Sequence, residues 1–506
     1  MNHWIIFPIL IPAVVAPLIV LTSRYDQVLA RVFSTSATLL MLIVSGVLFH
    51  QVDSGPSFHY ELGNWPTPFG IALVLDRLSA TMLLLSSLLG FVIALATIDG
   101  WDDRGRHFHS LLLMQLGGIN GAFLTGDLFN LFVCFEVMLI ASYGLMVHGG
   151  GATRLRAGIQ FVVINLCGSS VFLVALGLIY AATGGLNMID VADKLSLLPP
   201  ANRAIMSCGI TLLMLVFALK AALVPLQFWL PSAYSYAPPL VAALFAIATK
   251  VGVYCIIRIQ SVILAGNEHI LSEWTLVWLL PAGLATIAVG MIGVVASRAL
   301  GQMASYATLA SSGTILVCLA MFSTKSFAGG MYYLVHSTIA GAALFLVIDA
   351  IVQRRPKLSD RLVVGSGLPQ AGLIGGLFLI TAIAMVGLPP LPGFIGKLLI
   401  LDAVRDSEWN AWIWIVILST SILGILGFAR AGSSLFWKNS SSDDFQQKHG
   451  DPHHETVPRR ELRPSPTPMT LIASGLLVVL LFGLTASAAP MLDNLNTTAA
   501  QVWKSE

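Results

Sequence analysis

Five ionisable residues stand inside long apolar stretches of the sequence: Glu136, Lys220, Lys250, His336 and Lys397. An uncompensated charge at the centre of a bilayer costs roughly 2.5–3.5 kcal/mol on insertion scales. One glutamate cannot pair one-to-one with three lysines, and a lysine removed from water without an acidic partner gives up its proton more readily. This set predicts a path for protons or cations. His336 is a candidate relay within it, because histidine titrates near neutral pH.

A structural explanation stays open for these residues. A buried ion pair can hold helices in register, and a single histidine is often a packing residue. Arg258 lies close to the end of its apolar stretch, so its guanidinium is expected to reach the membrane interface. Asp76, Asp127 and Asp349 also lie near such ends, where interface water is expected to solvate them.

The apolar stretches themselves are long enough to be membrane-spanning helices. The chain of 506 residues is 56% hydrophobic and 10% charged, whereas soluble domains carry about 25% charged residues. Runs of about 20 apolar residues can cross a hydrocarbon core of about 30 Å. We predict an all-α membrane protein with about fourteen transmembrane helices, at 4–22, 32–50, 74–98, 108–126, 128–147, 157–182, 205–228, 239–262, 274–297, 301–322, 328–352, 370–401, 410–437 and 468–490.

Prolines interrupt two of these predicted helices. Pro225 follows Lys220 in one of them, and Pro389, Pro390 and Pro392 stand in the other. Proline removes a backbone donor, and such a break persists in a membrane only where protein or a wet cavity covers it. The second broken helix is the fifth helix after the first, so the two cross the membrane in opposite directions, and we expect two inverted five-helix repeats with a site near mid-membrane. Two unrelated kinks are the alternative.

This pattern divides the chain into five parts. We expect helices 1–3 in residues 1–105, the first repeat in 106–262, the second repeat in 263–437, a flexible cytoplasmic linker in 438–467, and the last helix with a short tail in 468–506. The linker is the one long polar stretch. His449, His453 and His454 lie in it, and a solvated linker explains them better than a metal site.

Basic residues in the predicted loops give the orientation, because cytoplasmic loops carry more Lys and Arg. One set of loops holds seventeen such residues and the other holds six. The first set, which includes the linker, is therefore expected to be cytoplasmic. Both termini are expected on the outer side of a bacterial inner membrane, and the first helix is expected to be retained.

Several kinds of chemistry find no support in the sequence. The five cysteines form no CxxC pair, so no iron–sulfur or zinc site is expected. No Gly-rich phosphate loop precedes a helix. The net charge of +2 comes from scattered basic residues, which gives no reason to expect nucleic-acid binding. We expect neither cofactor nor metal.

Four motifs together resemble a known family. They are Lys220 to Pro238 with its continuation through Lys250 to Arg258, Leu75 to Ala80, Phe129 to Glu136, and Gly387-Leu388-Pro389. They resemble the antiporter-like subunits shared by respiratory complex I and Mrp-type (Pha/Mnh) multisubunit cation/proton antiporters. The resemblance covers residues 70–437. The lysine at Lys397, the length, and the lack of a long amphipathic helix after the last span favour the Mrp-type D subunit.

The resemblance implies a transporter subunit and not an enzyme. Such a subunit works with A, B, C, E, F and G type partners to exchange cytoplasmic Na⁺ or K⁺ for external protons. Glu136 would pair with Lys220, Lys250 would pass protons laterally, and Lys397 would gate exchange with the far side or a neighbouring subunit. The coupling would be electrostatic, with no covalent step.

Three positions depart from the family pattern. Gln227 stands where relatives often have histidine, Gly301-Gln302 where a basic pair is common, and Gly341 where many have a lysine. The missing lysine at Gly341 leaves a gap in a lysine-to-lysine relay. Waters and His336 would have to bridge that gap. Two alternatives stay open: a proton-pumping subunit of complex I or a membrane-bound hydrogenase, and a scaffold subunit that transports nothing.

Overall fold

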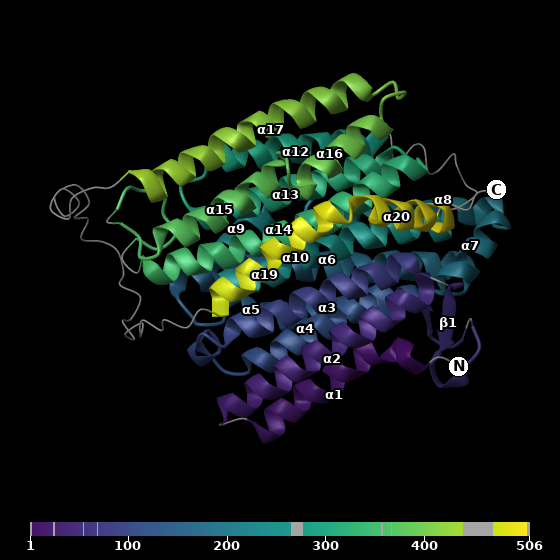
Figure 1. The fold of residues 1–506 in the computed structure, drawn as a ribbon. Coiled ribbons are helices and arrows are strands. Elements are labelled where there is room, and N and C mark those ends of the chain that lie inside the picture. Colours follow the sequence, from purple (N-terminus) through teal and green to yellow (C-terminus); the bar gives the residue numbers. More distant parts are fainter. Residues whose placement is uncertain are drawn as a thin grey trace.

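The structure is a computed structural model that describes residues 3–23, 26–53, 55–67, 69–264, 277–355, 358–365, 367–438 and 469–502. Long helices lie side by side in one broad layer, running back and forth across it (Figure 1). In chain order the main helices are α1 (Phe7–Thr22), α2 (Gln27–Asp53), α3 (Arg77–Thr97), α4 (Phe108–Leu124), α5 (Leu128–Met146), α6 (Ala152–Thr183), α8 (Pro200–Lys220), α10 (Pro239–Arg258), α12 (Leu280–Ala296), α13 (Leu300–Ala320), α14 (Thr324–Arg354), α15 (Ala371–Val386), α16 (Pro392–Ala403), α17 (Asn410–Gly432) and α19 (Met469–Ala486).

These helices account for every predicted span. Twelve helices in the described residues are long and apolar enough to cross a membrane, while α4 and α15 are shorter apolar helices. The all-α membrane class is therefore confirmed. The number of fourteen crossings stays a prediction, because it also counts α4 and the broken pair α15 and α16.

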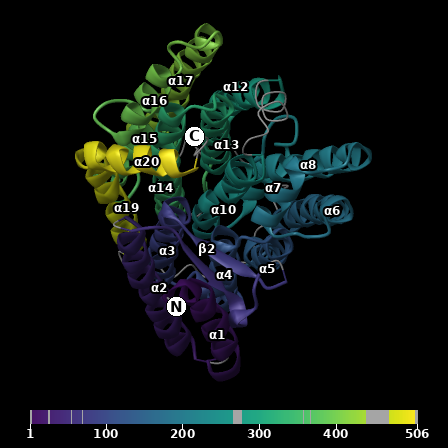
Figure 2. The same cartoon turned by 90° about the vertical axis from the view of Figure 1, so that its right-hand side faces the viewer.

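Three helices form the centre of the layer. α10, α13 and α14 are buried on nearly all sides, and each contacts the other two. Viewed from one end of the helices, α1 and α2 lie at one edge of the molecule and α17 at the opposite edge (Figure 2). In the outer helices α1, α17 and α19, only about a third of the most apolar stretch is buried inside the protein (33%, 33% and 39%). Their remaining apolar surface suits contact with lipid or other chains.

Both predicted helix breaks are present, and side chains satisfy the backbone groups that they free. At the first break, the Trp229 indole donates to the Leu219 carbonyl at 2.9 Å, and the Val224 amide donates to Thr286 Oγ1 at 3.0 Å. The second break begins at Gly387, whose φ of 81° is the left-handed conformation that favours glycine at a helix end. The backbone is therefore satisfied without water at these points, as membrane depth requires.

The sequence did not predict some smaller elements. β1 (Phe58–Glu61) and β2 (Ala72–Leu75) form an antiparallel pair before α3, with Phe58 opposite Leu75. Short helices α7 (Met188–Ser196) and α9 (Trp229–Tyr236) flank α8. 3₁₀-helices lie at His3–Ile6, Leu62–Asn64 and Asp102–Arg104, and π-helices at Ile259–Ile263 and Ser433–Trp437.

The expected short tail is a helix over most of its length. α20 (Ala488–Val502) follows α19 and packs on α14 and α3. The N-terminal and C-terminal ends of the chain lie at the same side of the layer, together with β1 and α7 (Figure 1). The predicted linker at 438–467, with its three histidines, lies outside the described residues apart from Lys438.

Candidate functional site

Lys220 is the last residue of α8 and stands directly at the first helix break. Its side chain is buried, with 5% of the residue exposed. Nζ donates a hydrogen bond to Oδ1 of Asn165 on α6 at 2.8 Å. The ammonium also lies 5.8 Å from the centroid of the Phe135 ring on α5, which is within cation–π range. Two neutral groups therefore hold the charge.

The implied ion pair between Glu136 and Lys220 is not formed. No carboxylate oxygen of Glu136 lies within 4.0 Å of Nζ, although the two charges are close enough to interact electrostatically. Across the described chain, the buried Oε1 of Glu136 finds no hydrogen-bond partner. Glu136 is half-buried on α5, between Val133 (41% exposed) and Ile140 (63% exposed) on the same helix row. Glu136 thus stands on a partly exposed row of α5 with its Oε1 buried, whereas Lys220 is buried inside the chain.

A small cavity adjoins Lys220 on the inner side. It has a volume of about 30 Å³, and Gln115, Ser142, Asn165 and Lys220 supply its polar lining. Gln115 is fully buried on α4, and neither of its amide atoms has a hydrogen-bond partner among the described residues. A polar cavity needs about 10–15 Å³ to hold a water molecule. Its size and its unpaired amide suit one or two waters beside the lysine.

Lys250 lies in the centre of the molecule on α10. It is 1% exposed, and its Nζ donates to the hydroxyl oxygens of Ser311 at 3.0 Å and Ser312 at 3.3 Å on α13. Hydroxyl groups can both accept and donate, so this environment can solvate a charged or a neutral amine.

Lys397 and His336 meet at the second helix break. Lys397 Nζ donates to the Val386 carbonyl at 2.6 Å and to Ser421 Oγ at 2.8 Å. His336 Nε2 lies 3.1 Å from the Ala384 carbonyl, while its buried Nδ1 lacks a partner within the described ranges. Both side chains therefore contact carbonyls from the last turn of α15.

The three lysines share one kind of environment on a series of packed helices. Each ammonium is bound by neutral oxygens, and no carboxylate of the described residues lies within 4.0 Å of any of them. α8 packs on α10, α10 on α13 and α14, and α14 on α16. A lysine that lacks a fixed counter-ion can bind and release a proton, so the arrangement suits stepwise proton transfer.

Gly341 leaves a gap in titratable groups on the central helix α14. A β carbon there would lie 3.7 Å from Thr308 Oγ1 on α13 and 3.8 Å from Ala246 on α10, both at ordinary contact distance. Between Lys250 and Lys397, α14 offers His336 as a buried titratable residue. A direct relay between lysine side chains is therefore interrupted on this helix.

The expectation for Arg258 was wrong. Its guanidinium is buried and forms two hydrogen bonds with Asp76, from Nη1 at 2.5 Å and from Nη2 at 2.7 Å. Nε donates to the Tyr254 hydroxyl at 2.7 Å. Asp76 also caps the N-terminus of α3 through the Ser79 amide. Arg258 therefore does not extend to the interface, because a carboxylate on α3 neutralises it inside the protein.

Asp349 was also assigned wrongly to the interface. It is fully buried on α14, where its carboxylate accepts from the Trp101 indole at 2.8 Å and from Gln353 Nε2 at 2.7 Å. Asp127, in contrast, does stand at a helix end and caps α5 through the Asn130 amide at 2.8 Å.

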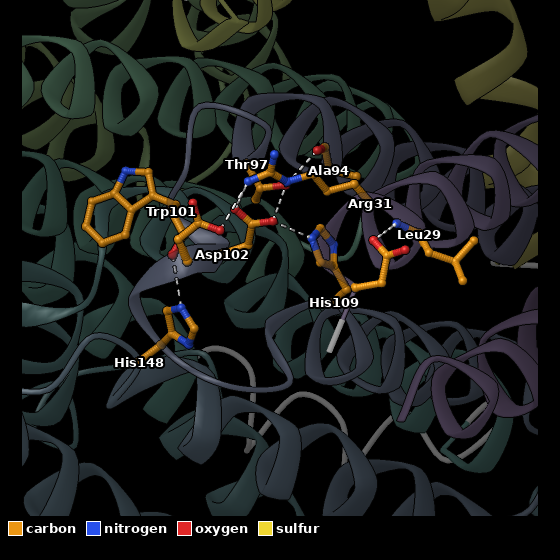
Figure 3. Close-up of polar contacts among 10 residues, drawn as sticks. Leu29, Arg31, Ala94, Thr97, Trp101, Asp102, His109 and His148 are labelled. Carbon is orange, nitrogen blue, oxygen red and sulfur yellow. Dashed lines mark hydrogen bonds and ion pairs between the residues drawn. The ribbon is translucent and has the colours of Figure 1, made fainter. Parts of the chain in front are cut away.

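A second ionised cluster lies at the end of α3 and was not predicted. Asp102 accepts from Arg31 Nε at 2.6 Å and Nη2 at 2.8 Å, and lies 3.1 Å from His109 Nε2 (Figure 3). Burial alone would raise the pKa of Asp102, but the hydrogen bonds from His109 and Arg31 outweigh it and lower that pKa to about 2. The carboxylate is therefore charged at neutral pH and joins α2 to α4.

The chain is similar in sequence to membrane subunits of one known family. Residues 125–424 match the family described as NADH:quinone oxidoreductase/Mrp antiporter, TM. Over 472 residues the chain is 39% identical to a protein of Rhizobium meliloti (strain 1021) named as the D subunit of a probable K(+)/H(+) antiporter, and the match covers 86% of this chain and 87% of the relative. Over 498 residues it is 34% identical to the D subunit of the Na(+)/H(+) antiporter of Bacillus subtilis (strain 168), at 97% and 96% coverage.

Solved structures show the same fold. A chain of the Mrp complex from Dietzia sp. DQ12-45-1b matches with a TM-score of 0.86 at 26% identity, over 100% of this chain and 98% of that one. A chain of respiratory complex I from Thermus thermophilus matches with a TM-score of 0.77 over 99% and 98% of the two chains. At 23% identity, that second likeness concerns the fold alone.

Proposed function

Because the chain belongs to the family of NADH:quinone oxidoreductase and Mrp antiporter membrane subunits, we propose that its buried lysines carry protons within a multisubunit monovalent cation/proton antiporter. The chain is a subunit of such an antiporter and a multi-pass membrane protein. Like the relatives named as antiporter D subunits, it is a transporter subunit and not an enzyme. The other antiporter subunits are its partners, with Na⁺ or K⁺ and protons as the ions exchanged.

One observation carries the proton path: three buried lysines are bound only by neutral oxygens. A scaffold would be better served by the arrangement at Arg258, where a carboxylate neutralises the cation with two hydrogen bonds. Lys220 instead has an amide oxygen, Lys250 has hydroxyls, and Lys397 has a carbonyl and a hydroxyl. These partners stabilise an ammonium less than a carboxylate does. The proton is therefore easier to release.

Glu136 supplies the control of this path from its outer side. It shares a helix row with exposed Val133 and Ile140, and a carboxylate on such a row is costly against lipid. We infer that a neighbouring subunit covers this row in the complex. Movement of Lys220 from Asn165 toward Glu136 would hold the lysine charged, and movement back would favour release of its proton.

The remaining steps use the central helices. Protons pass from Lys220, through the waters expected beside Gln115, to Lys250 on α10. His336 and waters bridge α14, because Gly341 offers no side chain, and Lys397 exchanges protons with the far side or with a neighbour. The two breaks at Lys220 and Lys397 belong to the proposed inverted repeats, 106–262 and 263–437.

The proposed location is a bacterial inner membrane, with both chain ends on the outer side. The loops on the opposite side, together with the segment 438–467, hold most of the basic residues, as cytoplasmic loops do. The position of both chain ends at one side of the helical layer supports placing the two ends on the same side of the membrane (Figure 1).

Glu136→Gln and Lys220→Ala test the function directly. Each variant is made in the full set of subunits, and antiport is followed with a pH-sensitive dye in everted vesicles. We expect both to abolish exchange while native gels show an assembled complex. Arg203→Gln, an exposed residue on α8, serves as the control with a normal rate. Normal exchange in either of the first two variants would refute the proton path.

A further inference from the structure

A second cavity lies at one end of the helices, between the α1–α2 turn and the loop before α4. It has a volume of about 140 Å³, and its lining includes Ile19, Ser23, Ala30, Asp102, Arg106 and His109. One water needs about 10–15 Å³, so this cavity has room for a polyatomic ion. Residues of α1 and α2, which form one edge of the molecule (Figure 2), line it, and Lys220 is not among its lining residues.

The N-terminus of α4 opens into this cavity. His107, the residue before the helix, has a left-handed φ of 63° and provides no side-chain cap. Throughout the described residues, the backbone N–H groups of Phe108, His109 and Ser110 have no acceptor. Gly105, Arg106, His107, Phe108 and His109 all line the cavity. Free N–H groups and the positive end of the helix dipole favour an anion there.

His109 gives an independent indication of a ligand. It lines the cavity and is 4% exposed. Its Nε2 lies 3.1 Å from Asp102 Oδ2, whereas its buried Nδ1 has no partner in the described part of the chain. A carboxylate only accepts hydrogen bonds, so Nε2–H donates to Asp102. Among the described residues, Nδ1 is then left without a partner at the cavity wall, and a hydrogen-bonding ligand in the cavity would supply one.

The acids around the cavity are already engaged. Arg31 donates to both oxygens of Asp102 (Figure 3) and also pairs with Asp103 at 3.3 Å. Asp26 accepts from the Leu29 amide at the start of α2. The Arg31 guanidinium therefore occupies the Asp102 carboxylate, which disfavours a metal cation, and the exposed Arg106 adds positive charge at the rim.

We propose that this cavity binds a phosphate group, held by the α4 N-terminus, His109 and Arg106. The site lies where α1 and α3 end and α2 and α4 begin, and the ends of membrane-spanning helices reach the level of the lipid headgroups. A lipid phosphate fits this position, since Ile19 and Ala30 give the cavity an apolar side for the start of the acyl chains. Free inorganic phosphate has the same chemistry, so the test separates the two sources.

The test uses the purified complete antiporter complex and two probes. Native mass spectrometry measures binding of dioleoyl phosphatidic acid, with dioleoylglycerol as the matched lipid without phosphate. Thermal unfolding measures binding of inorganic phosphate, at constant ionic strength with chloride. Arg106→Gln removes an exposed charge that should not be needed for folding. Arg156→Gln removes an exposed charge from the same end, at the start of α6, and serves as the control.

We expect wild type and Arg156→Gln to bind phosphatidic acid, and dioleoylglycerol not to bind at this site. Arg106→Gln should bind it about tenfold more weakly, since a hydrogen bond to a charged group is lost. His109→Gln should show a similar loss. Stabilisation by millimolar inorganic phosphate without lipid binding would support the site with free phosphate as its source. Equal binding by wild type and Arg106→Gln, or no response to either probe, would overturn the proposal.

Discussion

Lys220 Nζ donates a hydrogen bond to Asn165 Oδ1 at 2.8 Å, so an amide on α6 and not a carboxylate holds this buried lysine. Asn165 is 2% exposed, and its own amide nitrogen donates to the Phe161 carbonyl at 2.8 Å. That second bond orients the amide and points its oxygen at the lysine. Asn165 is therefore a positioning residue for the proposed proton path.

Replacement of this amide by a carboxylate tests that role. Asn165→Asp keeps the size of the side chain and places a negative charge beside Lys220. An opposite charge at this distance favours the ammonium by about one to three pH units. We expect antiport in everted vesicles to shift its pH profile upward by about one unit or more, because proton release now requires a higher pH.

The matched control is Asn202→Asp, which makes the same change at the opposite end of α8. It should leave the pH profile in place. If Asn165→Asp also keeps the wild-type profile at normal assembly, Asn165 does not control the proton on Lys220.

Asp102 gives a pH dependence of stability outside the membrane-spanning segments. Its pKa is lowered from 3.8 to about 2 in the folded chain, where burial acts against the hydrogen bonds from His109 and Arg31. A lowered carboxyl pKa contributes stability above the unfolded value, and this is lost as pH falls from about 4 toward 2. The contribution at pH 7 is about 2 kcal/mol.

Thermal unfolding of the purified complex from pH 7 to pH 3 measures this effect. Asp102→Asn should unfold at a lower temperature than wild type at pH 7, and the difference should shrink as pH falls below 4. Asp103→Asn, at a residue whose side chain is 52% exposed, is the control with little change. A difference between Asp102→Asn and wild type that stays constant with pH would contradict the assigned role.

The sequence predicted what depends on composition and spacing along the chain. Apolar runs of about 20 residues predicted the helices, and Pro225 and Pro389 predicted the two breaks, because both signals are local. Lys220 does stand at one break, and Lys397 follows the other. The roles of these lysines stay predictions.

The partners of the charged groups could not be predicted, because they depend on how each helix is rotated against its neighbours. Asn165 lies 55 residues from Lys220 in sequence, and Asp76 lies 182 residues from Arg258. Serines such as Ser311 and Ser421 are common in membrane helices, so their types alone gave no signal. Asn165 is a lone amide in an apolar run, and this could have indicated that it binds a buried polar group such as Lys220.

The orientation of the chain predicts which side reagents can reach the segment after α17. Positive-inside counting places this segment in the cytoplasm. A cysteine at Ser441, in a background without the five native cysteines, should resist a membrane-impermeant thiol reagent in intact cells. It should react after the cells are opened. Labelling in intact cells would reverse the proposed topology.

Lys397 separates proton transfer from scaffolding most sharply, because the two roles predict opposite results for one substitution. Its ammonium is bound by the Val386 carbonyl and the Ser421 hydroxyl, and both could also accept hydrogen bonds from an arginine. Arginine keeps its proton, since its pKa exceeds about 12. If Lys397 must release a proton in every cycle, Lys397→Arg should abolish antiport although the positive charge is retained. If Lys397 only holds α16 against α15, Lys397→Arg should work and Lys397→Ala should not.

The measurement is antiport rate against pH for both Lys397 variants, with assembly checked on native gels. Ser421→Ala is a useful companion, because it removes one neutral partner and leaves the lysine able to titrate. We expect Ser421→Ala to transport with an altered pH profile, in contrast to an inactive Lys397→Arg. The lysine side chain lies close against Gly387, where a β carbon would be only 2.9 Å from its Cδ, so the bulkier guanidinium could also fail by size. Lys397→Gln is smaller than lysine and cannot titrate, so failure by size does not apply to it, and we expect it to be inactive as well. An active Lys397→Gln complex with the wild-type pH profile would eliminate the titrating role.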